Sequence, residues 1–224
     1  MTGQPWILAT RNAGKLRELR ALFADVGLEV VDLAQAGIVE RPEEEQIEIH
    51  DTFEANALAK ARYYAARARG RTVVADDSGL EVLALAGAPG VKSKRWSGRS
   101  DLSGAALDAS NNALLLERLA DGADRRARFV CAAAWCDGAR SEVVRGEVPG
   151  VIVTEAAGMD GFGYDPHFFA TELGMTLGEA TVAEKQRVSH RARAFAALLQ
   201  RLRTRGVVSS AVSASVRTRV AGGS

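Results

Sequence analysis

The stretch from residue 126 to residue 136 constrains the fold of this 224-residue chain more than any other, because both of its faces are apolar. Successive side chains of a strand point to opposite faces. Phe129 and Trp135 would lie on one face, while Val130 and Ala132 would lie on the other. A strand with two apolar faces is covered on both sides and lies inside its sheet. We therefore predict an α/β fold in which this segment is a central strand.

Hydrophobic periodicity divides the rest of the chain into strands and helices. Shorter strands are predicted at 6–10, 30–31, 72–75, 141–147 and 151–154. Helices are predicted at about 15–27, 51–68, 111–120 and 184–203, and a polar, turn-rich segment is predicted at 101–110. No period is visible after Gly206. We therefore expect one domain over residues 1–206 and a flexible tail over residues 207–224.

Charge and composition argue against several classes of function. A formal net charge of +1 gives no overall field that would attract nucleic acid or a membrane surface. Apolar runs are much shorter than a membrane span, and the N-terminus lacks the pattern of a secretory signal. Cys131 and Cys136 lie five positions apart in one predicted strand, so they point to opposite faces and should not pair. We expect a reduced, cytoplasmic enzyme with no nucleic-acid or membrane partner.

Two adjacent carboxylates mark the first candidate site. Asp76 and Asp77 follow the strand predicted at 72–75 and precede Ser78 and Gly79. Ligands of α/β proteins bind where strands end, and neighbouring strand residues face opposite ways. One carboxylate could therefore face a metal and substrate while the other anchors the turn. The alternative is that Asp-Asp-Ser-Gly is only a turn, because these residue types dominate turns.

A second candidate site is the junction between the first strand and the helix after it, which carries Thr10, Asn12 and Lys15. Free N–H groups in the first turn of a helix favour a bound phosphate, although the residues of a Walker loop are missing here. On the helix predicted at 51–68, Asn56 and Lys60 are four residues apart and share a face. Such side chains suit a polar ligand if buried, and are ordinary solvated groups if exposed.

Two later segments offer contacts for a nucleobase. The loop at 161–166 combines two glycines, two aromatic rings and a carboxylate, and its rings could stack on a flat base. The alternative for this loop is a hydrophobic plug over the core. Among the polar side chains in the first half of the last predicted helix are Lys185, Ser189, His190 and Arg191. They could contact a base or a phosphate, although such residues more often lie on the surface.

Six motifs lie in order along the chain: ATRNAGK at 9–15, TFEANALAKA at 52–61, ADDSGL at 75–80, GAPGV at 87–91, the loop at 161–166, and Lys185 with SHR at 189–191. Together they resemble the inosine triphosphatase family, also called the Ham1 family, whose members hydrolyse noncanonical purine nucleoside triphosphates. The motifs occur in the family's order and cover residues 6 to about 203. Six ordered motifs make a chance match negligible. The chain departs from the family pattern at His50, Leu83 and Lys94.

The resemblance implies an elongated α/β fold with a mixed sheet, two lobes, a central active-site cleft and a homodimeric assembly. It implies cleavage of ITP, dITP and XTP to the monophosphate and pyrophosphate, with Mg²⁺ as cofactor. It assigns Asp77 as the catalytic carboxylate, and Glu48 and Asp77 as metal ligands. The residues that match substrate contacts are Thr10, Asn12, Lys15, Lys60, Ser78, Phe162, Gly163, Tyr164, Asp165, Lys185, His190 and Arg191.

A mechanism follows from these residues. Bound Mg²⁺ would lower the pKa of water, Asp77 would accept the proton, and lysines would stabilise the pyrophosphate leaving group. Arg191 has only donors, so it would favour the C6 carbonyl of hypoxanthine or xanthine over the amino group of adenine. Two alternatives are a nucleotide-binding regulator and a pyrophosphatase for modified pyrimidine or methylated nucleotides. Aligned carboxylates argue against the first, and a substrate panel would distinguish the second.

Overall fold

One mixed sheet organises the computed structural model, which describes residues 4–119 and 122–208. Its strand order is β2-β1-β3-β4-β5-β6-β7. The strands are β1 (Trp6–Leu8), β2 (Val30–Asp32), β3 (Val73–Val82), β4 (Arg126–Cys136), β5 (Ser141–Ile152), β6 (Phe168–Ala170) and β7 (Met175–Thr176). β1 is parallel to both of its neighbours, and every pairing from β3 to β7 is antiparallel. The predicted mixed sheet is therefore confirmed.

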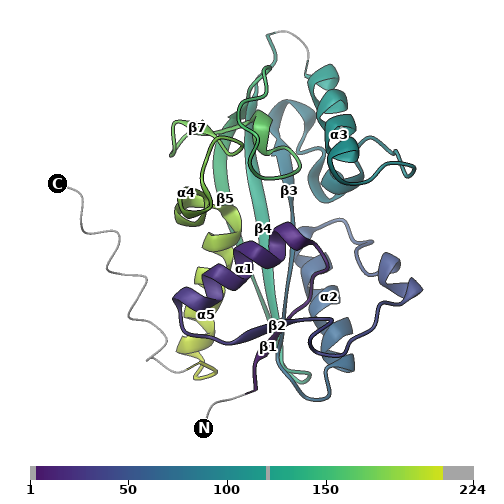
Figure 1. Ribbon diagram of the computed structural model, residues 1–224, viewed down its shortest axis with the longest axis vertical. Coiled ribbons are helices and arrows are strands. Elements are labelled where there is room, and N and C mark those ends of the chain that lie inside the picture. Colours follow the sequence, from purple (N-terminus) through teal and green to yellow (C-terminus); the bar gives the residue numbers. More distant parts are fainter. Residues whose placement is uncertain (1–3, 120–121, 209–224) are drawn as a thin grey trace, which may run out of the picture.

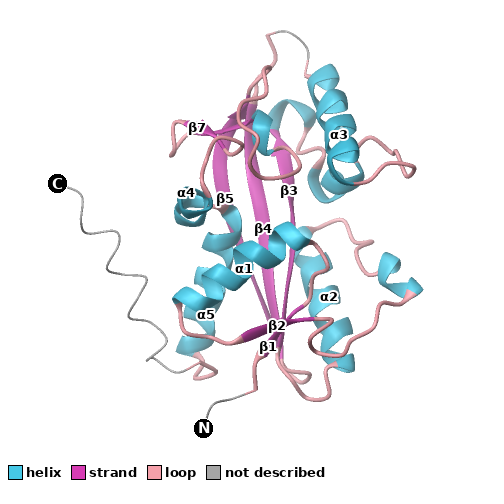
Figure 2. Cartoon of the chain, viewed as in Figure 1, coloured by secondary structure: helices cyan, strands magenta, loops and turns pink. Residues whose placement is uncertain are grey.

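Helices flank this sheet in an elongated molecule with two lobes (Figures 1 and 2). The α-helices are α1 (Ala13–Asp25), α2 (Phe53–Arg67), α3 (Gly104–Arg118), α4 (Val182–Val188) and α5 (His190–Thr204). Short 3-10 helices are η1 (Pro42–Gln46), η2 (Leu83–Leu85), η3 (Gly90–Arg95) and η4 (Asp165–His167). The lower lobe in Figure 1 holds β1, β2, α1, α2 and α5, the upper lobe holds α3 and β7, and the long strands β3, β4 and β5 run through both. None of the described helices is long and apolar enough to cross a membrane.

Helices cover both faces of β4, as its two apolar faces predicted. On one face, Val130 and Ala132 pack in a core cluster with Phe53 and other residues of α2. On the other face, Trp135 packs with Phe195 of α5 and with residues of α1. A third cluster fills the upper lobe around Leu115, Phe129 and Phe168. The two cysteines are free and buried in opposite clusters, so the expectation that they do not pair is confirmed.

The central strand β3 is longer than the sequence predicted, and the Asp-Asp-Ser-Gly segment is not a turn. Residues 73–82 pair in unbroken register with residues 127–136 of β4. Gly79 marks a close approach, because a Cβ there would lie 2.6 Å from the carbonyl oxygen of Gly90. The prediction that the strand ends at residue 75 was wrong because the carboxylates interrupt an apolar pattern without interrupting the backbone pairing.

Three other boundaries also differ from the prediction. The segments 141–147 and 151–154 form one strand, β5, which tolerates Pro149 and Gly150 in pairing with β4. α3 begins at Gly104 rather than Asn111, because its first turns are mostly exposed and therefore show no apolar stripe. The last helix is broken at Ser189, whose ψ of 142° is extended.

The start of the predicted tail belongs to the core. Val208 is 8% exposed and packs in the cluster of α1 and α5. The N–H of Val207 donates to the carbonyl oxygen of Leu202 at 2.9 Å. The domain boundary predicted at residue 206 is therefore too early, because two isolated valines give no period that sequence reading could detect. Residues 209–224 of the predicted tail lie outside the described residues.

Candidate active site

The candidate active site lies where β1 ends beside the middle of β3. The pairing of β1 with β3 stops at Leu8↔Val74, just before Asp76. Lys60, which α2 carries, donates from Nζ to the Asp76 carbonyl oxygen at 3.0 Å. A lysine therefore satisfies the backbone acceptor of β3 at the edge where the neighbouring strand has ended, and the ammonium group is fixed beside the carboxylates.

Asp76 is a fully buried anion held by two cations. Lys15 Nζ lies 2.9 Å and Arg191 Nε 3.2 Å from its Oδ2. The Ser78 hydroxyl donates to the same oxygen at 2.5 Å. Burial alone would raise the pKa of Asp76, but the charges of Lys15 and Arg191 lower the pKa well below its usual range. Asp76 therefore stays ionised and anchors cations, and it is a poor candidate for a base.

Asp77 faces the opposite side of β3, as the alternation of strand side chains predicted. Asn56 Nδ2 donates to its Oδ2 at 3.0 Å, and the Ser78 N–H donates to its Oδ1 at 3.0 Å. Burial raises the pKa of Asp77 to about 6, with Lys15 opposing that rise and the Glu48 carboxylate adding to it. A carboxylate with a pKa near the working pH is suited to act as a general base.

Glu48 completes a pair of carboxylates that fits a magnesium ion. Its side chain forms an ion pair with Lys60, and its carbonyl oxygen accepts a hydrogen bond from Arg95 Nη2 at 2.9 Å. Within residues 4–119 and 122–208, no three His, Cys, Asp or Glu side chains converge as an all-protein metal site. Mg²⁺ typically takes one or two carboxylates and completes its shell with water and substrate phosphates. The Glu48 carboxylate contributes to the raised pKa of Asp77, and two such carboxylates are a donor set that suits that ion.

The junction before α1 is built as predicted. The Asn12 side chain caps the helix, because its Oδ1 accepts the Lys15 N–H at 3.0 Å. Thr10 is buried and accepts the Asn12 N–H at its hydroxyl, at 3.2 Å. The Lys15 side chain is only 15% exposed and reaches Asp76. The solvated-lysine alternative is therefore excluded, and Lys15 links the first turn of α1 to Asp76.

The loop 161–166 links the upper lobe to α1. A Cβ on Gly14 would lie 2.8 Å from the Phe162 ring, so this ring lies directly against the first turn of α1. The Tyr164 ring fits the alternative of a hydrophobic plug over the core, because it is 4% exposed and packs in the upper core. Its hydroxyl donates to the Ser93 carbonyl oxygen at 2.8 Å.

Buried polar contacts fix this loop from two sides. Asp165 Oδ2 forms a buried ion pair with Lys185 Nζ at 2.9 Å. On the other side, the Gly163 N–H donates to Asp108 Oδ2 of α3 at 2.8 Å. Burial raises the pKa of Asp165, and the Lys185 charge opposes that rise. The predicted residues Gly163, Asp165 and Lys185 therefore form one unit, with α3 as its support.

The break between α4 and α5 places the next predicted residues. Ser189 caps α5 by accepting the Ala192 N–H at its hydroxyl, at 3.0 Å. The His190 ring stacks on Phe129, with ring centroids 4.9 Å apart and planes 14° apart. His190 is buried, and its Nδ1 has no hydrogen-bond partner among the described residues. Burial lowers the pKa of His190 well below the ordinary value, so the ring is neutral.

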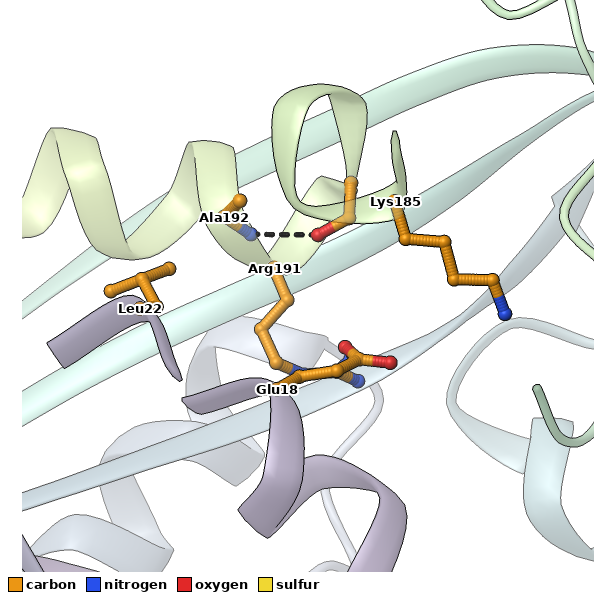
Figure 3. A pocket seen from close by; sticks show the side chains of 6 residues that line it. Glu18, Leu22, Lys185, Arg191 and Ala192 are labelled. Carbon is orange, nitrogen blue, oxygen red and sulfur yellow. Dashed lines mark hydrogen bonds and ion pairs between the residues drawn. The ribbon is translucent and has the colours of Figure 1, made fainter. Parts of the chain in front are cut away.

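Arg191 is held from three directions. Besides Asp76, its guanidinium donates from Nη2 to the Ser78 hydroxyl at 3.3 Å and from Nη1 to Glu18 of α1. Figure 3 shows Glu18 and Arg191 meeting between α1 and the start of α5. The predicted surface alternative is excluded for Arg191, which is 3% exposed. A guanidinium has five N–H donors, so this fixed arginine keeps donors beyond those three contacts.

Two hollows lie near these residues. A cavity of about 10 Å³, large enough for about one water molecule, is bounded by six side chains (Figure 3): Glu18, Leu22, Lys185, Ser189, Arg191 and Ala192. A wider hollow of about 440 Å³ lies at the start of α2, beside residues 86–92, Trp96 and Arg145. None of the predicted site residues lines the wider hollow, although the motif at 87–91 forms one of its walls.

Two residues of this site are not among those that the family resemblance assigned. Asn56 is 1% exposed and bonds both Asp77 and the backbone of His50. Its four-residue spacing from Lys60 was the sequence signal for it, and its burial favours the polar-ligand alternative over the solvated one. Glu18 lies one helical turn after Lys15, but its partner Arg191 is distant in the sequence, so only the fold reveals the contact.

The chain is similar to known proteins over most of its length. A model of the Ham1 family matches residues 6–201. The chain is 47% identical over 208 residues to a dITP/XTP pyrophosphatase of Bordetella pertussis, covering 90% of this chain and 92% of that protein. It is 50% identical over 200 residues to a dITP/XTP pyrophosphatase of Mycobacterium bovis, covering 88% and 95%.

Solved structures give the same picture. The Ham1 protein of Staphylococcus aureus matches with a TM-score of 0.75 and 34% identity, over 90% of this chain and 100% of that chain. A nucleoside-triphosphatase / dITP/XTP pyrophosphatase from Mycobacterium abscessus matches with a TM-score of 0.65 and 44% identity, over 88% and 99%.

Proposed function

The chain belongs to the Ham1 family, and from this premise we propose that it hydrolyses dITP, XTP and ITP to the nucleoside monophosphate and pyrophosphate. The relatives named dITP/XTP pyrophosphatase support the reaction and the substrate class. The role is removal of these nucleotides from the triphosphate pool.

The observation that carries the proposal is the opposite behaviour of two adjacent carboxylates. Asp76 is ionised and paired with two cations, whereas burial raises the pKa of Asp77 to about 6. Neighbouring titratable groups whose environments drive their pKa values apart are typical of acid–base catalysis. In the proposed reaction, Asp77 takes a proton from water while the water oxygen bonds to the α-phosphorus. The bond from that phosphorus to the bridging oxygen breaks, and pyrophosphate leaves.

Glu48 and Asp77 would hold the magnesium ion. When bound, Mg²⁺ would neutralise phosphate charge and make water more acidic. Asn56 would keep Asp77 oriented, because its amide donates to Asp77 Oδ2 and also bonds both backbone polar groups of His50. A catalytic carboxylate needs such support, since small errors in its placement cost large factors in rate.

The surrounding cations would bind the triphosphate. Lys15 and Lys60 flank the carboxylates, and Lys185 comes from the opposite side of the site. Thr10, Asn12 and the first turn of α1 add hydroxyl, amide and N–H groups. Positive charge near the bridging oxygen stabilises the leaving pyrophosphate, which carries more charge in the transition state than in the substrate.

Base selection would depend on the upper lobe and α5. Phe162 offers a ring for stacking, and Ser78, Gly163, Tyr164, Asp165 and His190 are proposed to line the base and sugar. Arg191, which Asp76 and Glu18 hold in place, presents donors that suit a C6 carbonyl and not an amino group. Leaving buried polar groups mismatched costs a few kcal/mol, enough for about 10²-fold discrimination. A homodimer and a cytoplasmic location are further proposals, supported by the family resemblance.

A panel of nucleoside triphosphates tests the function. Pyrophosphate release would be measured for dITP, XTP and ITP, for dATP and dGTP, and for modified pyrimidine and methylated nucleotides, with and without Mg²⁺. We expect kcat/KM for the first three to exceed that for dATP by about 10²-fold. Preference for the pyrimidines, or release of phosphate in place of pyrophosphate, would refute the proposal. Tight binding of these nucleotides without turnover would indicate that the protein is a nucleotide-binding regulator and not an enzyme.

A further inference from the structure

The segment that carries Glu48 is held by a half-buried ionic cluster rather than lying free in solvent. Glu44 in η1 accepts two hydrogen bonds from Arg11, at 2.9 Å from Nε and 3.0 Å from Nη2. The Tyr64 hydroxyl donates to it at 2.7 Å, and Arg67 Nη1 donates at 2.9 Å. These four residues are called the Glu44 cluster below. A run of acidic residues such as 40–51 usually forms a solvated loop, and Glu44 is an exception to that pattern within this run.

Glu44 differs clearly from its neighbour Glu43. The Glu44 side chain is 10% exposed, whereas that of Glu43 is 52% exposed and has longer contacts, at 3.4 Å, with Arg41 and Tyr63. Burial opposes ionisation of Glu44, but the hydrogen bonds from Arg11, Tyr64 and Arg67 lower its pKa to about 2. Glu44 therefore stays ionised, with its carboxylate held between two cations and a phenol.

The Glu44 cluster joins three parts of the site. Arg11 lies between Thr10 and Asn12, in the junction that leads into α1. Tyr64 and Arg67 lie in the last turns of α2, the helix that also carries Asn56 and Lys60. Glu44 therefore ties its own segment to the phosphate-binding junction on one side and to α2 on the other.

The other end of the segment is held independently. Arg95 Nη2 donates to the Glu48 carbonyl oxygen at 2.9 Å. The His50 N–H donates to Asn56 Oδ1 at 2.9 Å, and Asn56 Nδ2 donates back to the His50 carbonyl oxygen at 3.2 Å. Glu48 thus lies between two anchors, and the Glu44 cluster is the anchor that precedes it. Releasing one end would let the Glu48 carboxylate move relative to Asp77.

We propose that Glu44 is a positioning residue, which acts through Glu48 to set the geometry of the divalent-cation site and couples that site to the α1 junction. This inference rests on the proposed function, in which Glu48 and Asp77 hold the cation. Groups that orient metal ligands typically contribute 10–100-fold to metal affinity. Glu44 itself does not touch the cation or the substrate.

The test is Mn²⁺ binding to Glu44→Gln, measured by electron paramagnetic resonance in the presence of the α,β-methylene analogue of dITP, which cannot be cleaved at that bridge. We expect the Mn²⁺ dissociation constant to rise about 10-fold or more relative to the wild-type protein. Turnover of dITP should fall at low Mg²⁺ and recover largely at saturating Mg²⁺. Glu43→Gln is the matched control, with the same change of charge in the same 3-10 helix, and its dissociation constant should stay within about twofold.

A purely structural role for Glu44 would lower the melting temperature without changing the Mn²⁺ dissociation constant, and that result would overturn the inference. Tyr64→Phe keeps the buried ring and removes only one donor, so it serves if Glu44→Gln does not fold. It should weaken Mn²⁺ binding in the same direction by a smaller factor, and an unchanged constant there would also overturn the inference.

Glu48→Gln separates this inference from the proposed function. If Glu48→Gln abolishes Mn²⁺ binding while Glu44→Gln leaves it unchanged, the metal site stands and only the positioning role of Glu44 fails. If Glu48→Gln leaves Mn²⁺ binding intact, the proposed metal site itself is wrong, and the role of Glu44 fails with it.

Discussion

Replacing Asp76 and Asp77 separately by Asn should move the stability of the protein in opposite directions. The two residues are adjacent on β3, and each variant replaces Asp by Asn. A difference between the variants therefore reports the surroundings of each carboxylate and not the substitution itself. Asp76 holds Lys15 and Arg191, whereas Asp77 is an ion whose burial is only partly compensated. Asp76→Asn should therefore destabilise the fold, and Asp77→Asn should stabilise it.

The magnitudes follow from the contacts. Removing one partner of a buried ion pair costs about 3–5 kcal/mol. The lower end applies to Asp76→Asn, because Arg191 keeps its contact with Glu18. For Asp77, a pKa of about 6 against an unfolded value of about 3.9 corresponds to about 3 kcal/mol of destabilisation when ionised. Asp77→Asn removes that cost but loses the Ser78 N–H bond, about 1 kcal/mol. The net gain is roughly 1–2 kcal/mol.

The pH dependence of unfolding independently tests whether each variant gains or loses stability. Because the folded pKa of Asp77 is raised, its contribution to stability is full below about pH 4 and is lost as the pH rises through about 6. The advantage of Asp77→Asn should therefore be present at pH 8 and shrink between pH 6 and pH 4. Because the folded pKa of Asp76 is lowered, its contribution is full above about pH 4 and is lost only at lower pH. The deficit of Asp76→Asn should therefore be constant from pH 8 to pH 5.

Urea unfolding without divalent cations, at pH 8, 6 and 5, measures both effects. In thermal unfolding at pH 8, also without divalent cations, the melting temperature of Asp77→Asn should rise by roughly 2–8 °C for a chain of this length. If both variants lose stability by similar amounts at every pH, the account of one paired and one strained carboxylate is wrong.

Two further predictions concern the frame of the site. Deleting residues 207–224 should lower the free energy of unfolding by about 1–3 kcal/mol more than deleting residues 209–224, because Val208 is buried and the Val207 N–H is hydrogen-bonded. Equal unfolding midpoints for the two truncated proteins would show that these valines do not contribute to stability. Gly146→Ala should destabilise the fold by about 1–3 kcal/mol and lower turnover. The new Cβ would lie 2.4 Å from Ala194 N and 2.6 Å from the His190 carbonyl oxygen, so it would displace α5. An unchanged melting temperature and an unchanged kcat/KM would contradict this prediction.

The interior of the sheet could be predicted from the sequence more reliably than the boundaries of the elements. The two apolar faces of β4 required cover on both sides, and core clusters lie on both. The end of β3 could not be predicted in the same way, because charged residues in a strand interior are rare. Asp76 is tolerated there only because Lys15 and Arg191, from distant parts of the chain, neutralise it. No local pattern reports such a pairing.

Contacts at long sequence separation account for the other differences. The surroundings of Tyr164 and His190 could not be read from their motifs, because Tyr164 packs in the upper core and His190 stacks on Phe129, which is distant in the sequence. Glu44 resembles its neighbours in a run of acidic residues, and only the approach of Arg11 and Arg67 distinguishes it. The alternation of Asp76 and Asp77 was predictable because it depends on strand geometry alone.

Turnover of dITP by Asp77→Asn at saturating Mg²⁺ tests the central claim, that Asp77 is the base of a nucleoside triphosphate pyrophosphatase. We predict that kcat falls by at least about 10²-fold, the range for a lost general base, while the dissociation constant of the α,β-methylene analogue of dITP changes only a few-fold. Asp101→Asn, which changes an exposed carboxylate, should leave kcat unaltered. A kcat for Asp77→Asn within a few-fold of the wild-type value would contradict the claim.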